Sequence, residues 1–185
     1  NLSDLFLNKG IKKFIQIGSS VEYGKIKSPQ QEKSFIKAKS VKSTYGLSKL
    51  KASNYLMYLY KKFKFPAVIL RLYLIYGPNQ EINRFLPIII TNCIKNKTFP
   101  CSEGRQFRDF LYIDDLVNAI EKFLNSKKNL NGKIFNIGSG KPINIKYIIK
   151  TIQKIINGGE PLYGKIKLRK DEIIHLYPSI KKIKK

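Results

Sequence analysis

The segment Tyr45-Gly46-Leu47-Ser48-Lys49 sets a phenol and an ammonium group four residues apart. On a helix, side chains with this spacing lie on one face, one turn from each other. An ammonium group within a few ångströms stabilises a phenolate, so a tyrosine beside a lysine can take up and release a proton in catalysis. The same spacing is common on ordinary exposed helices, and alone it favours that simpler interpretation.

A second polar segment, residues 19–24 (SSVEYG), directly follows the apolar run 14–17 and Gly18. A short apolar run that ends at a glycine is typical of a buried parallel strand. Ligands of open α/β sheets bind beyond the carboxyl ends of such strands, so the hydroxyl groups of Ser19 and Ser20 are placed where a ligand would lie. Taken alone, an ordinary polar turn is the better interpretation.

The elements that would position these segments follow a strand–helix–strand order. The strand at 14–17 is followed by a polar loop at 25–43, a helix at 45–64 and a strand at 67–73. Such a unit is a right-handed crossover and predicts a parallel sheet. Further along we expect helices at 85–95, at 115–124 with Asp114 as N-cap and between Asn144 and Asn157, and extended segments at 109–113, 134–137 and 166–168.

The composition predicts a soluble α/β domain. Apolar residues make up 43% of the 185, enough for a core, and no apolar run approaches the ~20 residues needed to cross a bilayer. No secretory signal is visible. Cys93, Cys101 and the single histidine, His175, fit neither a disulfide framework nor a metal site. We therefore expect a reduced, cytoplasmic protein with no membrane partner and no bound metal.

The formal charge of +24 raises the alternative of a nucleic-acid-binding protein. The lysines are spread along the whole chain, however, together with many isoleucines and asparagines, a combination that AT-rich coding sequence produces. Only five of the 36 basic residues are arginines, the residue that base recognition favours. We expect no nucleic-acid partner, and a non-catalytic Rossmann-fold protein that senses dinucleotides or binds RNA stays as the alternative hypothesis.

Five segments together resemble one protein family: IQIGSSVEYG, STYGLSKLKA, VILRLYLIYGPNQ, GRQFRDFLYIDDLVNAI and FNIGSGKPINI. They resemble, in order, the signatures of the extended short-chain dehydrogenase/reductases, which are nucleotide-sugar epimerases, dehydratases and reductases. The resemblance runs from about Lys12 to Asn144. The family's glycine-rich pyrophosphate motif is absent, so we expect a C-terminal fragment that is inactive by itself.

The resemblance implies a role for residues of both polar segments. Tyr45 matches the acid/base tyrosine, and Lys49 matches its partner, which also contacts the nicotinamide ribose of NAD or NADP. Ser19 matches the Ser or Thr that hydrogen-bonds the sugar oxygen. Gly18 and Tyr73 match positions at the cofactor pocket.

Substrate contacts are implied beyond the catalytic residues. Arg108 matches the arginine that holds the nucleotide diphosphate, a contact suited to a planar guanidinium fork. A plain ion pair between Arg108 and Asp109 is the alternative. The other positions that match substrate contacts are Ser20, Asn83, Leu86 and Pro87.

The implied fold is the C-terminal portion of a Rossmann-type parallel sheet over residues 1–79. A smaller nucleotide-sugar-binding lobe would span 80–185, of which about 110–137 packs back on the Rossmann core. The implied activity is that of an NAD(P)-dependent nucleotide-sugar 4-epimerase or 4-keto-6-deoxy-sugar reductase, with hydride transfer at sugar C4. A homodimer through the Tyr45-bearing helix is implied as well.

A sugar 4,6-dehydratase is not expected. Members of the family with that activity carry an Asp and a Glu directly after the strand-end Thr, where this chain has Ser20 and Val21. Valine cannot move a proton, and serine has no evident partner base. Glu22 is one residue further on, and in an extended segment its side chain turns to the other face; a bend would bring it back.

Overall fold

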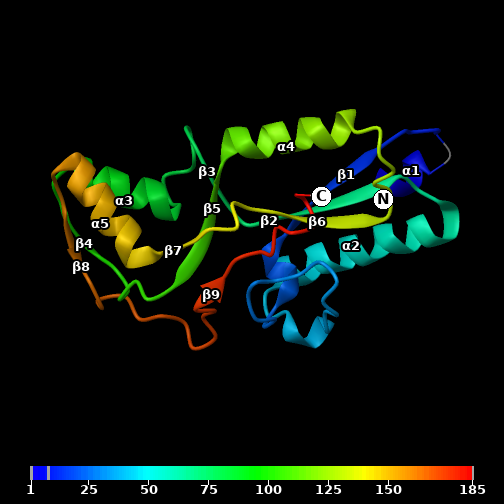
Figure 1. The fold of residues 1–185 in the computed structure, drawn as a ribbon. Coiled ribbons are helices and arrows are strands. Elements are labelled where there is room, and N and C mark those ends of the chain that lie inside the picture. Colours follow the sequence, from blue (N-terminus) through cyan, green and yellow to red (C-terminus); the bar gives the residue numbers. More distant parts are fainter. Residues whose placement is uncertain (1, 8, 185) are drawn as a thin grey trace.

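The computed structural model describes residues 2–7 and 9–184, and Figure 1 shows two lobes side by side in an elongated molecule. The larger lobe has three layers, with a parallel sheet between two helices. Its sheet consists of β1 (Phe14–Ser19), β2 (Ala67–Leu72) and β6 (Lys133–Ile137), and its covering helices are α2 (Thr44–Phe63) on one face and α4 (Ile113–Asn125) on the other. The expected α/β class with a Rossmann-type parallel sheet is confirmed.

The strand β2 lies in the middle of this sheet and is buried on both faces. Val68 and Leu70 pack toward α4, while Ala67 and Ile69 pack toward α2. This burial on both faces is the physical reason why the run is continuously apolar, whereas a half-exposed strand would alternate apolar and polar residues. The order β1-β2-β6 is parallel throughout, with Ser19 opposite Leu72, so the carboxyl ends of all three strands meet at one edge.

The smaller lobe is built from short strands and two helices. Its core lies between α3 and α5 and includes Ile89, Cys93, Phe99, Ile145 and Ile149. Its elements are β3 (Leu74–Tyr76), α3 (Phe85–Ile94), β4 (Thr98–Pro100), β5 (Phe107–Tyr112), β7 (Pro142–Asn144), α5 (Ile145–Ile156), β8 (Glu160–Leu162) and β9 (His175–Leu176). The strand β5 pairs with β3, β7 and β9, and β4 pairs with β8.

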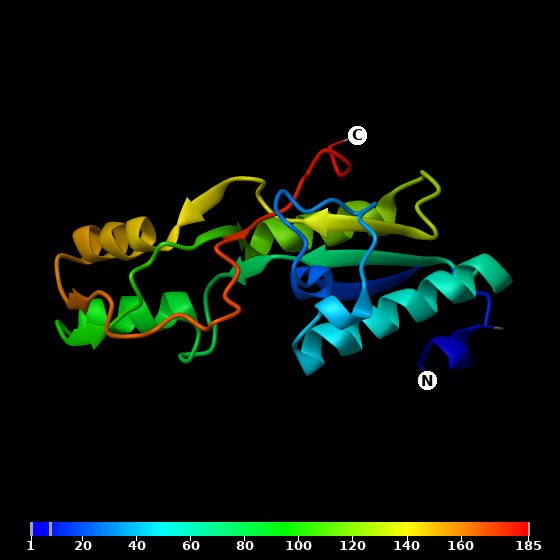
Figure 2. The same cartoon turned by 90° about the horizontal axis from the view of Figure 1, so that it is seen from below.

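Contacts between segments distant in sequence hold the fold together. After β9 the chain returns to the sheet (Figure 2), where Lys182 donates to the carbonyl of Ile134 at 2.7 Å. The ammonium group of Lys13, before β1, caps the C-terminus of α4 by donating to the carbonyls of Phe123 at 2.9 Å and Ser126 at 2.8 Å. The remaining helical segments are α1 (Leu2–Phe6) and two 3₁₀ turns, η1 (Ser20–Tyr23) and η2 (Ala38–Ser40).

Two expectations about local structure are wrong. The strand expected at 166–168 is absent: the amide of Ile166 donates to the carbonyl of Cys101, and the segment that pairs with β4 is β8. The helix expected to start after Asp114 begins at Ile113, with Tyr112 as N-cap, so Asp114 lies in its first turn. A carboxylate in the first turn still stabilises the helix through its dipole.

The division of the chain at residue 79 stays a prediction. It requires part of the segment 110–137 to pack on the Rossmann core, and β6 from this segment does pair with β2. Among the described residues, no helix is both long and apolar enough to cross a membrane. In the same residues, no three His, Cys, Asp or Glu side chains lie together as metal ligands would.

Candidate active site

A hollow of about 590 Å³ lies beyond the carboxyl ends of β1 and β2, where ligands of parallel sheets bind. Its walls come from the end of β1, the start of α2, the segment after β2 and the first turn of α3. Five of the residues predicted for the site line it: Gly18, Ser19, Tyr45, Tyr73 and Leu86. The fold therefore brings together residues that are up to 68 positions apart in the sequence.

The start of α2 presents Tyr45 and Lys49 on one face. Ser43 caps this helix by accepting a hydrogen bond from the amide of Gly46 at 3.0 Å, which fixes where the first turn begins. The Lys49 Nζ lies 5.7 Å from the centre of the Tyr45 ring and donates to the carbonyl of Ile17 at 3.0 Å. Tyr45 is 57% exposed, so its phenol is open to a ligand in the hollow.

The chain after β1 bends at once into η1. Ser19 is the N-cap of this turn: its Oγ accepts from the amide of Val21 at 3.4 Å. The bend turns Ser20 inward, where it is buried and absent from the walls of the hollow, while Val21 lines them. Glu22 is fully buried and does not line the hollow either.

The side chain of Tyr73 points into a buried polar network. Its hydroxyl donates to Oε1 of Gln30 at 2.7 Å, and burial raises the pKa of this phenol. Gln30 is linked in turn through its carbonyl to Asn136, which accepts from the hydroxyl of Tyr23 at 2.7 Å. Tyr73 thus keeps its hydroxyl inside the protein while lining the hollow, and its predicted contact with the cofactor stays a prediction.

The predicted substrate contacts around α3 are placed unequally. Leu86 lines the hollow, Pro87 is half-buried in the first turn of α3, and Asn83 is exposed and outside the walls. Arg84, the N-cap residue of α3, lines the hollow beside Glu81 and is a basic residue that the sequence analysis missed. Because the chain has only five arginines, each could have been considered as a candidate, and Arg84 would then have been included.

Arg108 lies in a different place from the hollow. Its guanidinium pairs with Glu172 and donates to the carbonyl of Ile174 at 3.1 Å, and burial lowers its pKa. The alternative pair with Asp109 is not formed, because Asp109 accepts from the amide and hydroxyl of Ser139. Glu172 lines a second, mostly apolar hollow of about 270 Å³ between α3 and α5. Arg108 is therefore linked, through Glu172, to the wall of this second hollow.

The donor groups at the first hollow fit the nicotinamide ribose end of a dinucleotide. A phenol at Tyr45 and an ammonium group at Lys49 lie next to each other at the carboxyl edge of parallel strands. The Gly-x-x-Gly-x-x-Gly spacing of a pyrophosphate-binding turn does not occur among the described residues.

Comparison with known proteins places this geometry in a family. The chain is 32% identical over 163 residues to the dTDP-D-glucose 4,6-dehydratase of Dictyostelium discoideum, covering 81% of the chain and 36% of the relative. It is 34% identical over 150 residues to the dTDP-4-dehydro-6-deoxyglucose reductase of Escherichia coli, covering 78% of the chain and 45% of the relative.

Solved structures give the same result. The UDP-glucuronic acid 4-epimerase of Bacillus cereus, crystallised with UDP-glucuronic acid and NAD, superposes with a TM-score of 0.88 at 29% identity. The match covers 98% of this chain and 57% of that chain. The chain thus spans about half the length of such relatives or less. Because residues 1–138 match the family model, the chain belongs to the NAD dependent epimerase/dehydratase family.

Proposed function

We propose that the chain is part of a nucleotide-sugar 4-epimerase or of a reductase that acts on 4-keto-6-deoxy nucleotide sugars, with NAD or NADP as cofactor. The observation that carries the proposal is the placement of Ser19 and Tyr45 on the walls of one hollow, with the ammonium group of Lys49 beside the Tyr45 ring. The relatives, an epimerase and a reductase among them, support the substrate class.

The cofactor, when bound, would exchange a hydride with C4 of the sugar. Ser19 would hold the oxygen on this carbon through its hydroxyl. Tyr45 would remove the proton of that oxygen when the carbon is oxidised, and return it when the carbon is reduced. Lys49, held by the carbonyl of Ile17, would keep its positive charge near the phenolate that forms.

The 3₁₀ turn after Ser19 supports the exclusion of 4,6-dehydration. Dehydration needs one group to remove the C5 proton and another to protonate the leaving C6 hydroxyl. Ser20 is buried, Val21 has no proton to exchange, and Glu22 is buried beneath the turn rather than on the hollow. The bend that would have brought Glu22 to the substrate is present, but it directs the carboxylate inward.

A panel of UDP-, dTDP-, CDP- and GDP-hexoses tests the reaction type. The whole protein is incubated with NAD or NADP and each sugar, and the products are separated by chromatography. We expect a C4 epimer, or oxidation of NAD(P)H when a 4-keto-6-deoxy sugar is supplied. A 4-keto-6-deoxy product from a hexose, recognised by its absorbance in alkali, would contradict the argument from Ser20, Val21 and Glu22.

Replacement of Arg108 tests its assignment to the nucleotide diphosphate. Arg108→Ala should raise the substrate KM by ~10-fold or more, with cofactor affinity little changed, because a charged hydrogen bond contributes ~1.5–3 kcal/mol. Arg108→Lys keeps the charge but loses the fork and should recover only part of the affinity. A fall in cofactor affinity, measured by calorimetry, would show that the assignment is wrong.

The partner proposals are a nucleotide-sugar substrate and a second copy of the chain through α2. The exposed ring of Tyr58 on α2, stacked on Tyr55, supports such a contact.

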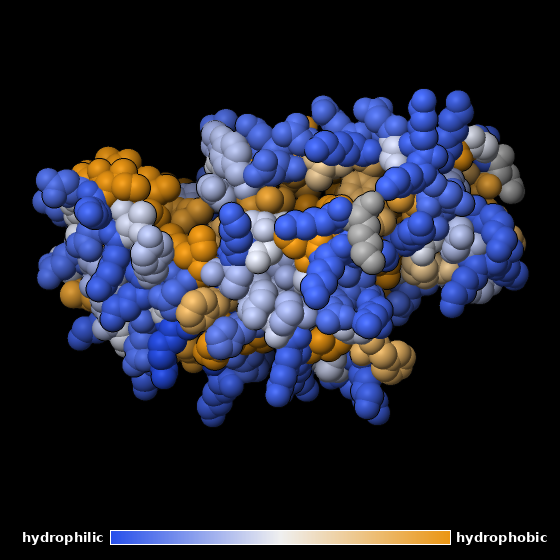
Figure 3. Space-filling view, viewed as in Figure 1, coloured by the Kyte–Doolittle hydropathy of each residue, from blue (hydrophilic) through white to orange (hydrophobic). Residues whose placement is uncertain are grey.

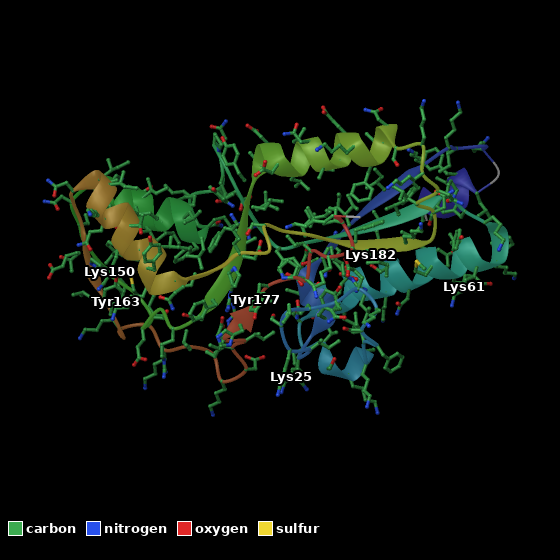
Figure 4. All side chains as sticks on the ribbon, viewed as in Figure 1. Lys25, Lys61, Lys150, Tyr163, Tyr177 and Lys182 are labelled. Carbon is green, nitrogen blue, oxygen red and sulfur yellow. The ribbon has the colours of Figure 1, made fainter. Side chains whose placement is uncertain are left out.

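For nucleic acid as a partner, a concentrated basic face would be needed. Four labelled lysines, Lys25, Lys61, Lys150 and Lys182, lie on separate parts of the fold in Figure 4, and Figure 3 shows hydrophilic residues of every kind over much of the visible face.

A further inference from the structure

We infer that Glu22 is a positioning residue of this active site: its buried carboxylate sets the spacing between the turn that carries Ser19 and the helix that carries Tyr45. The inference rests on the proposed function and goes beyond it, because it assigns a role to a residue that does not touch the hollow. The hydroxyl of Ser19 and the phenol of Tyr45 must reach the same sugar oxygen, so their spacing decides how well a proton is transferred.

Three elements meet at the Glu22 carboxylate. Its Oε1 accepts from the amide of Ser19 at 2.9 Å, at the end of β1. Its Oε2 accepts from the hydroxyl of Ser53 on α2 and from Nε of Arg71 on β2, each at 2.9 Å. Since the residue is 0% exposed, water does not compete for these contacts. Hydrogen bonds to a charged acceptor are the strong ones, and a buried carboxylate with several donors holds them rigidly.

Ser53 connects this carboxylate to the reacting side chains of α2. Tyr45, Lys49 and Ser53 follow one another at intervals of four residues and therefore form one stripe along the helix. The stripe is attached to β1 and its turn at two points, through Lys49 to the carbonyl of Ile17 and through Ser53 to Glu22. Two attachments one turn apart fix the rotation of α2 as well as its distance from Ser19.

The surroundings are shaped for a carboxylate at this position. A Cβ added to Gly18 would lie 2.5 Å from Oε1 of Glu22, so the glycine leaves the space that the carboxylate occupies. The guanidinium of Arg71 lies 4.5 Å from the centre of the Tyr23 ring, which holds it in place toward Glu22. This gives Gly18 a second reason to be glycine, besides its place on the wall of the hollow.

Two variants of the whole protein, with cofactor and sugar substrate, test the inference. Ser53→Ala removes only the donor from α2, and Glu22→Gln replaces the carboxylate by an amide that cannot accept from all three donors. We expect kcat to fall about 10-fold for Ser53→Ala and up to about 100-fold for Glu22→Gln, since a misplacement of ~1 Å can cost ~10²-fold. Substrate KM and cofactor affinity should stay within about twofold, because the binding groups remain.

Ser48→Ala is the matched control. It removes a serine hydroxyl from the same helix, but this hydroxyl is exposed, donates to the carbonyl of Tyr45 and contacts neither Glu22 nor β1. Its kcat should be unchanged. Amide exchange of residues 19–21, measured by mass spectrometry, should be faster in Ser53→Ala and Glu22→Gln than in the wild type or in Ser48→Ala.

The outcomes separate this inference from the proposed function. Active wild-type protein with normal kcat in both Ser53→Ala and Glu22→Gln would overturn the positioning role and leave the function standing. Wild-type protein without turnover on any nucleotide sugar would overturn the function and, with it, the catalytic importance of Glu22. In that case unchanged amide exchange would also show that Glu22 does not hold the Ser19 turn, whereas faster exchange would support that part.

Discussion

In the whole protein, replacing Tyr45 by Phe is expected to lower kcat by ~10²–10⁴-fold while cofactor binding persists. The phenol lies on the wall of the hollow with the Lys49 ammonium group beside its ring, and proton transfer by a positioned side chain contributes about this much. The Phe variant keeps the ring beside the Lys49 ammonium, so the start of α2 should be undisturbed. The measurement is steady-state turnover together with calorimetric titration of the cofactor.

A matched control is Tyr147→Phe on α5. Tyr147 is 64% exposed, similar to Tyr45, and lies in the smaller lobe away from the hollow. Loss of the Tyr147 hydroxyl should leave both turnover and cofactor affinity unchanged. Near-normal turnover in Tyr45→Phe, on the substrate that the wild type converts, would remove Tyr45 from the mechanism.

The replacement of Arg71 by Met is expected to lower the free energy of unfolding by ~3–5 kcal/mol. The side chains of Arg71 and Glu22 are 3% and 0% exposed, and removing one partner of such a pair leaves the other charge buried without its counter-ion. Chemical denaturation followed by circular dichroism measures the loss. If the variant does not fold, the double variant Arg71→Met with Glu22→Gln should regain part of the stability, because the uncompensated charge is then gone.

Arg105→Met provides the comparison. Arg105 bonds to Glu103 through the same atoms, Nε to Oε2, at 2.8 Å against 2.9 Å for the buried pair. The side chains of Arg105 and Glu103 are 71% and 58% exposed, and exposed ion pairs contribute only ~0–1 kcal/mol. Equal losses in the Arg71 and Arg105 variants would mean that burial of the Glu22–Arg71 pair has no energetic consequence.

Local periodicity was enough to predict the central α/β unit from the sequence. The apolar runs at 14–17 and 67–73 became β1 and β2, and the expected helix between them became α2; the run at β2 is continuous because both faces of that strand are buried. The N-cap at Asn144 was also predicted correctly, since its side chain accepts from the amide of Tyr147. The strands β3, β4, β7 and β8 have three residues each, too few for a pattern to show, and they were missed.

The candidate site also has features that the sequence predicts and features that depend on the tertiary fold. The sequence by itself determined that Tyr45 and Lys49 share a helix face and that Ser19 stands at the end of a parallel strand, because both depend on the spacing of near neighbours. Only the tertiary structure decided that Glu22 turns inward to Arg71, 49 residues away, and that Arg108 pairs with Glu172, 64 residues away. Such pairs form when packed strands and helices bring distant segments together, and no local pattern records which carboxylate will then face which guanidinium.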